Sequence, residues 1–248
     1  MIFKTEVEFE AAMITALQNK GWESHVLKYP TEDTLLKNWA NILFENNRAI
    51  DRLNDAPLTD TEMQQILEQV LALRTPLKLN GFINGKTVSI TRDNPDDPFH
   101  LGKEVSLKIY DRREIAAGQS RYQIAQQPKY KPKSKILNDR RGDLMLLING
   151  MPVFHLELKK SGIPVSQAHY QIEKYSDEGI FTGIFSLVQI FVAMQPEETV
   201  YFANPGPDGI FNKDFYFHWA DFNNEPINKW RDIATYLLSI PMAHQMIG

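Results

Sequence analysis

The sequence predicts an α/β fold, on the border with α+β, in which helices flank a mixed β-sheet. The first observation behind this prediction is the order of periodic patterns along the chain: helix, strands, hairpin, helix, strand and strand. The second is the composition, because 43% hydrophobic and 23% charged residues are typical of a globular protein. The third is the length of 248 residues without an internal repeat or a low-complexity linker, which favours a single domain over 1–248.

The chain is expected to begin with an amphipathic helix over residues 5–20. Thr5 and Glu8 form a capping box, in which each side chain accepts a hydrogen bond from the other residue's backbone. Gly21 follows the last apolar position and is expected to end the helix. The next stretch, "WESHVLKY", alternates like a short strand.

Residues 31–75 are expected to form a helical insertion. Two amphipathic patterns lie within it. The second begins with the capping box Thr59-x-x-Glu62 and stops before Pro76. The two helices are expected over 31–54 and 60–74.

From residue 77 onward the patterns change to strands. Turn glycines and alternation in "LKLNGFINGKTVSITRD" predict a hairpin, "EVSLKIYD" and "RYQIAQQ" predict further strands, and "PKYKPKSK" predicts a loop. Asn149-Gly150 is the strongest hairpin signal and joins two strands within 143–159. After it we expect a helix in "VSQAHYQIEKYSDE", strands in "SLVQIFVAM" and "TVYFAN", and a helical segment from about residue 228.

Several classes of protein and site are excluded by what the sequence lacks. It has no cysteine, so disulfides, thiolate zinc sites and cysteine nucleophiles are excluded. The N-terminus is too acidic for a signal peptide, and no apolar run approaches the roughly 18 residues of a membrane span, so we expect a cytoplasmic protein without a membrane partner. Neither H-E-x-x-H nor G-x-S-x-G is present, and the histidines show no ligand spacing.

The stretch "GFINGKT", residues 81–87, resembles the phosphate-binding P-loop but is one residue short between its glycines. The residues after it alternate like a strand, whereas a P-loop opens a helix whose N-terminus holds phosphate. We therefore expect a β-turn here and no ATP binding by this chain.

Basic residues gather between Arg121 and Arg141, although the net charge of the whole chain is −4. A local basic stripe is what phosphate contacts require, although a solvated lysine-rich loop is an equal alternative. Within it Asp139 is the one acidic residue, and the basic ones are Arg121, Lys129, Lys131, Lys133, Lys135, Arg140 and Arg141.

The stretch "MPVFHLELKKSG" carries the strongest candidate for chemistry. Its apolar residues alternate as in a half-buried strand, and His155, Glu157 and Lys159 share the other face. Glu157-x-Lys159 is the one acid-x-lysine triplet of the chain, and Asp143 begins the strand that the hairpin folds back beside it. Two carboxylates and an amine can hold Mg²⁺ and steady a water for attack on phosphate. The alternative is a surface ion pair with an unrelated aspartate.

This candidate site sets a condition on the hairpin. With a regular two-residue turn, Ile148 pairs with Met151, which places Asp143 opposite Leu156. Asp143 and Glu157 would then point to opposite faces of the sheet. The site requires a bulge or an irregular loop, and Pro152, which cannot donate a ladder hydrogen bond, makes an irregularity plausible.

With these residues, the sequence resembles the PD-(D/E)xK nuclease superfamily, and within it the N-terminal endonuclease domain of the motor (R) subunit of type I restriction–modification enzymes. The segments that carry the resemblance are "RRGDLMLLINGMPVFHLELKKSG", "RYQIAQQPKY" and "TEVEFEAAMITALQNKGW", together with the Q-x-x-x-Y motif of Gln171 and Tyr175. The resemblance implies a restriction-endonuclease-like core over 1–29 and 77–204. Residues 205–248 would lead toward a motor domain that this sequence does not contain.

The resemblance also implies roles for individual residues. Asp143 and Glu157 would ligate Mg²⁺ with the backbone carbonyl of Leu158, and Lys159 would orient the water and stabilise developing charge. Gln171 and Tyr175, which share a helical face, would lie near the site; the alternative for Tyr175 is a core aromatic beside Ile172. A glutamate of the first helix would approach the metal, Glu10 first and Glu6 second, the alternative being a solvated helix face.

Partners follow from the same resemblance. Relatives of this kind carry an ATP-driven translocase after the nuclease and assemble with methyltransferase (M) and specificity (S) subunits. The domain would then contact the phosphates of DNA and not its bases. Lys129, Lys131, Lys133, Lys135, Arg140 and Arg141 are the expected DNA contacts. A free-standing repair or recombination nuclease and a non-catalytic DNA or motor docking module are the alternatives.

Overall fold

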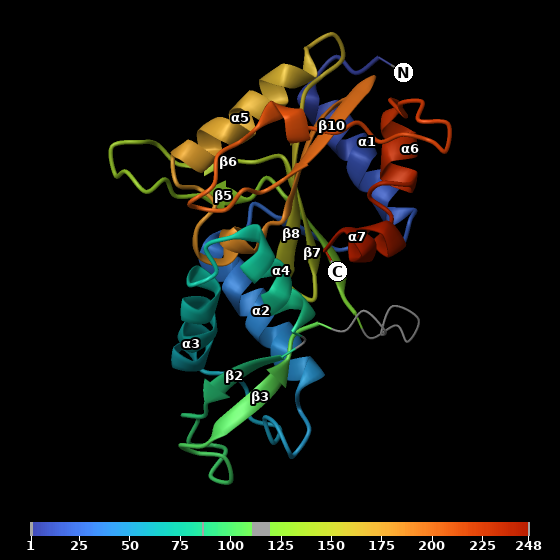
Figure 1. The fold of residues 1–248 in the computed structure, drawn as a ribbon. Coiled ribbons are helices and arrows are strands. Elements are labelled where there is room, and N and C mark those ends of the chain that lie inside the picture. The colour runs from blue at the N-terminus through green and yellow to red at the C-terminus, as the bar shows by residue number, and fades with distance from the viewer. Residues whose placement is uncertain (1, 86, 111–119, 248) are drawn as a thin grey trace.

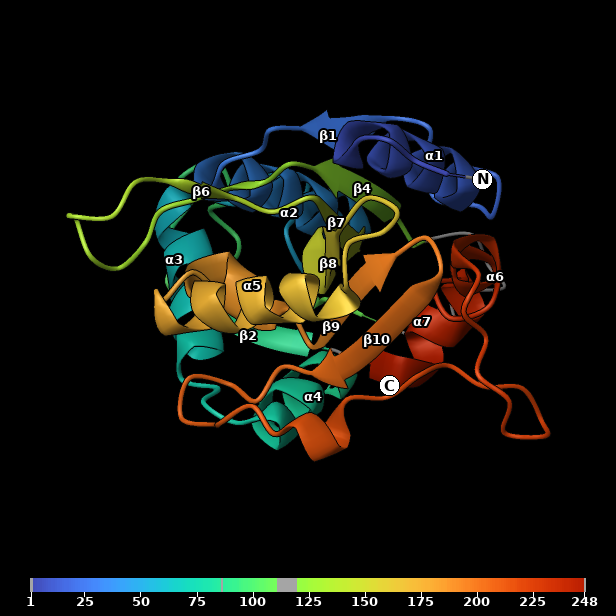
Figure 2. The same cartoon turned by 90° about the horizontal axis from the view of Figure 1, so that it is seen from above.

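The computed structural model describes residues 2–85, 87–110 and 120–247. Its centre is a six-stranded mixed sheet (Figure 1), and the strand order β1-β4-β7-β8-β9-β10 can be followed in Figure 2. The strands are β1 Val26–Lys28, β4 Tyr122–Gln126, β7 Leu144–Ile148, β8 Met151–Leu158, β9 Ile190–Gln195 and β10 Glu198–Ala203. The pairs β1–β4 and β8–β9 are parallel, and the other neighbours are antiparallel. The predicted α/β class is confirmed.

Helices cover both faces of this sheet. Figure 2 shows α2 and α5 on one side and α1, α6 and α7 on the other. The helices are α1 Glu6–Gln18, α2 Glu32–Asn46, α3 Asp60–Leu71, α4 Pro76–Asn84, α5 Val165–Asp177, α6 Trp230–Thr235 and α7 Ile240–Ile247, with 3₁₀ turns η2 Gly183–Leu187 and η3 Lys213–Phe215. Every residue of β8 is buried, so the expectation of a half-buried strand was wrong. A central strand that is covered on both faces is buried regardless of alternation.

The local capping and turn signals are confirmed. Both capping boxes are present, at Thr5 with Glu8 and at Thr59 with Glu62. Asn149 and Gly150 join β7 to β8 with backbone φ angles of 52° and 82°, the left-handed values that a type I′ hairpin turn requires.

The predicted hairpin over "LKLNGFINGKTVSITRD" was wrong in its first half. Residues 76–84 form helix α4, because Thr75 caps the backbone N–H of Lys78 and Pro76 occupies the first helical turn with φ already helical. Gly85 is the C-cap of this helix, and strand β2, Thr87–Thr91, follows it. The P-loop-like stretch therefore lies at a helix end and not in a β-turn, and its helix precedes the strand, the reverse of a P-loop.

The chain between β1 and β4 builds a lobe beside the sheet. It comprises α2, α3, α4 and a separate two-stranded sheet of β2 and β3, Glu104–Lys108. Inside it the buried Arg92 guanidinium contacts the carboxylates of Glu62 and Asp97. The helical insertion expected near 31–75 is thus the first part of a lobe that continues to Lys108.

The stretch expected as a basic loop begins with a short strand. β5, Lys129–Tyr130, pairs with β6, Arg140–Arg141, immediately before Asp143. The connection over 131–139 projects from the body of the protein (Figures 1 and 2). We name this segment, residues 131–139, the basic loop. Among the described residues, no helix is long and apolar enough to cross a membrane.

We expect Gly150 to be a more demanding position than another glycine of the same backbone conformation. Gly150 and Gly162 both have φ of 82°, but a Cβ at Gly150 would lie 2.9 Å from the Trp39 Cα, whereas one at Gly162 meets nothing within 4 Å. Gly162→Ala should cost about 1 kcal/mol of backbone strain, and Gly150→Ala about 1–3 kcal/mol more from the clash with the α2 backbone. Urea unfolding measures both, and equal losses would contradict the close approach.

Candidate active site

A β-bulge brings the two carboxylates of the candidate site to the same face. The β7–β8 register shifts between Leu146 and Leu147, because Leu146 pairs with Phe154 while Leu147 pairs with Pro152, which leaves Val153 as the extra residue. Beyond the bulge Leu144 pairs with Leu156, and this register continues with Asp143 opposite Glu157. The irregularity that the sequence required is present, and it lies in the strand beside Pro152 and not in the turn.

Asp143, Glu157 and Lys159 converge at the end of β8. The backbone N–H of Leu158 donates to Asp143 Oδ2 at 2.6 Å. Lys159 Nζ lies 3.6 Å from Glu157 Oε1. Glu157 and Lys159 are buried, whereas Asp143 retains partial exposure. Two carboxylates and an ammonium group therefore share one partly covered site.

Burial determines the electrostatics of this site. Desolvation raises the pKa of Glu157 to about 8, against the lowering effect of Lys159. Desolvation, and then the neighbouring Glu157, raise the pKa of Asp143 well above its usual range. Two carboxylates in this position resist being ionised together, so a bound cation would stabilise the form in which both are charged.

The donor set fits a hard divalent cation. Glu157 Oε2 is buried and has no hydrogen-bond partner among the described residues, so the protein leaves this carboxylate incompletely bonded at a place where that is costly. Within those residues no cluster of three or more His, Cys, Asp and Glu side chains is placed to hold a metal. A cation here would be bound by two carboxylates, a backbone carbonyl and water, a coordination typical of Mg²⁺.

Gln171 and Tyr175 of α5 connect the lysine to the strand before Asp143. Lys159 Nζ donates to Gln171 Oε1 at 2.8 Å, and Gln171 Nε2 donates to the Tyr175 hydroxyl at 2.7 Å. The Tyr175 hydroxyl in turn donates to the Arg141 carbonyl at 2.7 Å. The structure thus brings both residues of the motif to the site, and it also buries the Tyr175 ring, as the core-aromatic alternative expected.

Two of the three glutamates of α1 approach different parts of the site. Glu10 is buried, its carboxylate accepts hydrogen bonds from Gln126 and Gln127, and its charge contributes to the raised pKa of Asp143. Glu6 Oε1 lies 3.6 Å from Lys159 Nζ. The expectation of a solvated helix face is therefore wrong for Glu10.

The basic residues do not form one continuous stripe. Arg121 forms an ion pair with Glu23 and its backbone N–H donates to Asn149, so it lies at the hairpin-turn end of the sheet, away from Asp143. Arg140 forms an ion pair with Glu178 at the end of α5. The exposed basic side chains on the strand β5, the basic loop and the strand β6 are Lys129, Lys131, Lys133, Lys135 and Arg141.

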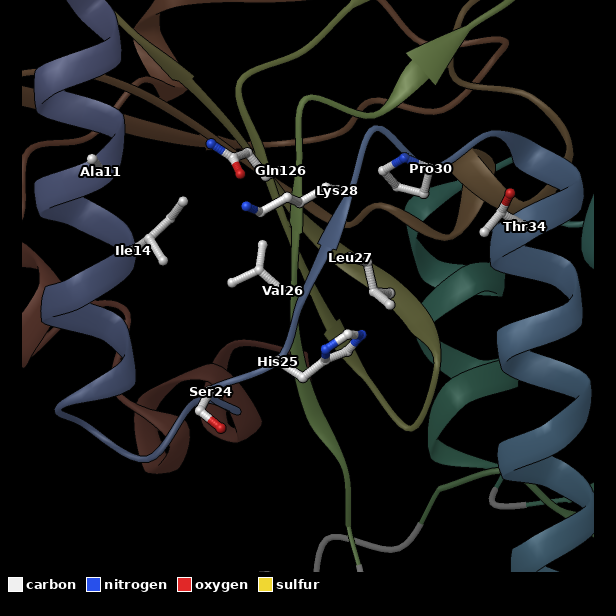
Figure 3. A pocket seen from close by; sticks show the side chains of 10 residues that line it. All are labelled: Ala11, Ile14, Ser24, His25, Val26, Leu27, Lys28, Pro30, Thr34 and Gln126. Atoms are coloured by element: carbon white, nitrogen blue, oxygen red, sulfur yellow. The ribbon is translucent and has the colours of Figure 1, made fainter.

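Two hollows adjoin the site. The larger one, of about 810 Å³, follows the edge strand β1 between α1 and α2 (Figure 3), and Gln126 lines it while also donating to Glu10. The smaller one, of about 440 Å³, lies on α5. It is lined by Arg140, Gln167, Tyr170, Gln171, Lys174 and Tyr175.

The sequence predicts no role for four residues that contact or adjoin the site. Gln126 and Gln127 hold Glu10, and Tyr130 bonds His155 next to Glu157. His155 was assigned to the face of Glu157 by strand periodicity, and this signal could have marked it as a neighbour. The other three lie in "RYQIAQQPKY", a segment that carries the family resemblance, but no local pattern indicates their contacts.

A mixed sheet that brings an aspartate, a glutamate and a lysine together at adjacent strand ends defines an α/β domain of nuclease-like fold. Residues 4–209 match the family described as the type I restriction enzyme R protein N terminus, and the chain belongs to that family, which confirms the resemblance.

Curated relatives agree with this membership. The type I restriction enzyme SsaAORF53P endonuclease subunit of Staphylococcus saprophyticus is 32% identical over 238 residues, which cover 96% of this chain and 23% of that protein. The SauMSSORF170P endonuclease subunit of Staphylococcus aureus is 29% identical over 234 residues, 94% of this chain and 23% of that protein. The EcoprrI endonuclease subunit of Escherichia coli is 27% identical over 235 residues, 94% of this chain and 69% of that protein. The chain spans about a quarter of the length of the two staphylococcal relatives.

The raised carboxylate pKa values predict an unusual pH dependence of stability without metal. A carboxyl whose pKa is higher in the folded than in the unfolded state stabilises the protein below the unfolded value, and this contribution is lost as pH rises through the folded value. For Glu157 the loss should extend from about pH 4.5 to about pH 8, with a slope of at most ~1.4 kcal/mol per pH unit. Urea unfolding in chelator measures it. Glu157→Gln should remove the share of the slope that Glu157 contributes and leave that of Asp143, whereas exposed Glu197→Gln should keep the whole slope. Parallel wild-type and Glu157→Gln curves would contradict the shift.

Proposed function

We propose that this chain is the Mg²⁺-dependent endonuclease domain of a type I restriction enzyme R subunit and hydrolyses phosphodiester bonds of DNA. The observation that carries the proposal is the convergence of Asp143, Glu157 and Lys159, which a regular hairpin would have prevented. Family membership and the names of the relatives, which are endonuclease subunits, support it. Convergence also weighs against a non-catalytic docking module.

Each residue of the site has a proposed role. Asp143, Glu157 and the Leu158 carbonyl would hold Mg²⁺, which would supply a Lewis acid for the phosphoryl oxygen and would lower the pKa of a bound water. Lys159 is held by Gln171 and lies 3.6 Å from Glu157, so its ammonium group would orient the attacking water and stabilise negative charge that develops on the phosphate. Tyr175 would keep Gln171 in place through its hydroxyl.

DNA would reach the site from the side of β5 and β6. The exposed lysines at positions 129, 131, 133 and 135, with Arg140 and Arg141, lie on the segment that leads directly into Asp143. Lysine and arginine contacts of this kind position a backbone and carry no sequence information. Sequence specificity would come from methyltransferase and specificity subunits of a cytoplasmic restriction complex, and ATP would act through a motor outside this chain.

Substitution of the triplet tests the catalytic proposal. Glu157→Ala and Lys159→Ala should each lower DNA cleavage by at least about 10²–10³-fold, because the first removes a metal ligand and the second removes charge stabilisation at the reacting phosphate. Plasmid cleavage in Mg²⁺ by the assembled restriction complex measures this. The adjacent Lys160 is exposed, so Lys160→Ala should cleave like wild type. Wild-type cleavage by Lys159→Ala would refute the assignment.

The basic loop offers a test of DNA binding. Replacing Lys131, Lys133 and Lys135 by alanine should weaken binding to duplex DNA and reduce the slope of log K against log salt by about 0.9 for each phosphate that the variant no longer neutralises. Fluorescence anisotropy over a salt series measures both quantities. The matched control removes three exposed lysines of the lobe, Lys37, Lys78 and Lys103, and should leave the slope unchanged. Equal slopes for both triple variants would mean that the basic loop is only a solvated segment.

A further inference from the structure

We propose that His155, held by Tyr130, is a positioning residue that fixes the Glu157 carboxylate for the divalent cation. The inference rests on the proposed function, because it deepens the account of the same metal site. Nothing in the Asp143, Glu157 and Lys159 triplet itself explains how the Glu157 carboxylate is oriented. His155 lies two positions before Glu157 on β8 and therefore on the same face of the sheet.

Two short distances connect three buried side chains, those of Tyr130, His155 and Glu157. The Tyr130 hydroxyl lies 3.0 Å from His155 Nδ1, and His155 Nε2 lies 3.4 Å from Glu157 Oε2. His155 Nε2 and Glu157 Oε2 are both buried and have no hydrogen-bond partner among the described residues. A small shift lets these two buried polar atoms form a hydrogen bond with each other. Leaving that hydrogen bond unmade at a buried place is costly.

One tautomer of the imidazole gives both of its nitrogens a partner. The Tyr130 hydroxyl, 3.0 Å from Nδ1, can donate its proton to that nitrogen. His155 then carries its own proton on Nε2, which points to Glu157 Oε2. A neutral imidazole that donates to one oxygen of a carboxylate leaves the other oxygen directed away from it. Glu157 Oε1, the oxygen that faces Lys159, would be directed to the cation.

The surroundings leave the imidazole little freedom to turn away. The ring of His155 packs against the rings of Tyr130, Tyr175, Phe181 and Phe191, with centroid distances between 5.3 and 6.4 Å. Tyr175 belongs to the helix that also holds Lys159 through Gln171. The same aromatic cluster therefore positions the imidazole and the catalytic lysine.

Gly142, the residue before Asp143, makes the approach possible. A Cβ at this position would lie 2.6 Å from His155 Cε1 and 2.7 Å from the Tyr130 hydroxyl. Its φ is not in the left-handed region, so the need for glycine is one of space and not of backbone conformation. A side chain here would displace the imidazole or the hydroxyl. Substitution of Gly142 is therefore an independent way to disturb the same contact.

The test measures Mn²⁺ affinity of the 248-residue chain by isothermal titration calorimetry, with thermal unfolding of each variant as a record of folding. Tyr130→Phe, His155→Phe and Gly142→Ala should each weaken Mn²⁺ binding by about 10–100-fold, the range expected when a metal ligand is deprived of its partner. His155→Gln, whose amide can donate to the same carboxylate, should recover most of the affinity. A purely structural role for His155 would not be rescued by an amide in an aromatic cluster.

A second tyrosine–histidine pair supplies matched controls. The Tyr122 hydroxyl lies 3.0 Å from His244 Nε2, in a cluster at the hairpin-turn end of the sheet. Tyr122→Phe should therefore bind Mn²⁺ with wild-type affinity, whatever it does to the melting temperature. Glu157→Gln should bind weakly or not at all.

The outcomes separate the two proposals. If wild type binds Mn²⁺, Glu157→Gln does not, and folded Tyr130→Phe and Gly142→Ala bind like wild type, the positioning role of His155 is overturned and the metal site stands. If Tyr122→Phe loses as much affinity as Tyr130→Phe, the effect is general and the positioning role is overturned too. If wild type binds no Mn²⁺, both the metal site and the role of His155 are overturned.

Discussion

The bulge at Val153 decides which side chains of β8 face the same way as Asp143. A strand reverses the direction of its side chains at each residue, so a single inserted residue exchanges the two faces for everything beyond it. Without the bulge Asp143 would lie opposite Leu156, and the carboxylates would be separated by the sheet. With it, Asp143, Glu157 and Lys159 meet at one strand end, and α1 and α5 deliver Glu10, Glu6 and Gln171 to the same place.

Bringing Asp143 and Glu157 together has an electrostatic cost, and this cost determines how the rest of the site is arranged. Desolvation raises the pKa of both carboxyl groups, Glu157 raises that of Asp143 further, and the nearby Lys159 ammonium group offsets only part of this. The surrounding polar groups are therefore arranged as fixed partners: Leu158 for Asp143, Gln171 for Lys159, and Gln126 with Gln127 for Glu10. A cation bound here would relieve the electrostatic cost that the fold itself imposes on the two carboxylates.

The sequence predicts those parts of the structure that depend on local signals. The capping boxes at Thr5 and Thr59 and the Asn149-Gly150 turn involve residues within a few positions of each other, and all are present. The helix at 76–84 was missed because its glycines resemble turn residues, whereas Thr75 and Pro76 decide the conformation. Hairpin geometry required an irregularity, but its location depends on the pairing of whole strands. The contact of Tyr130 with His155 joins residues 25 apart, so the sequence pattern around either residue does not predict it.

The lobe between β1 and β4 has a consequence for the order of folding. These strands are parallel neighbours, yet about a hundred residues separate them in the chain, so their pairing closes one of the longest loops of the domain. The hairpin of β7 and β8 closes almost no loop, and it therefore forms at little entropic cost. We therefore expect the hairpin to bring Asp143 and Glu157 together early, while β1, and with it α1 with Glu6 and Glu10, joins late and opens first.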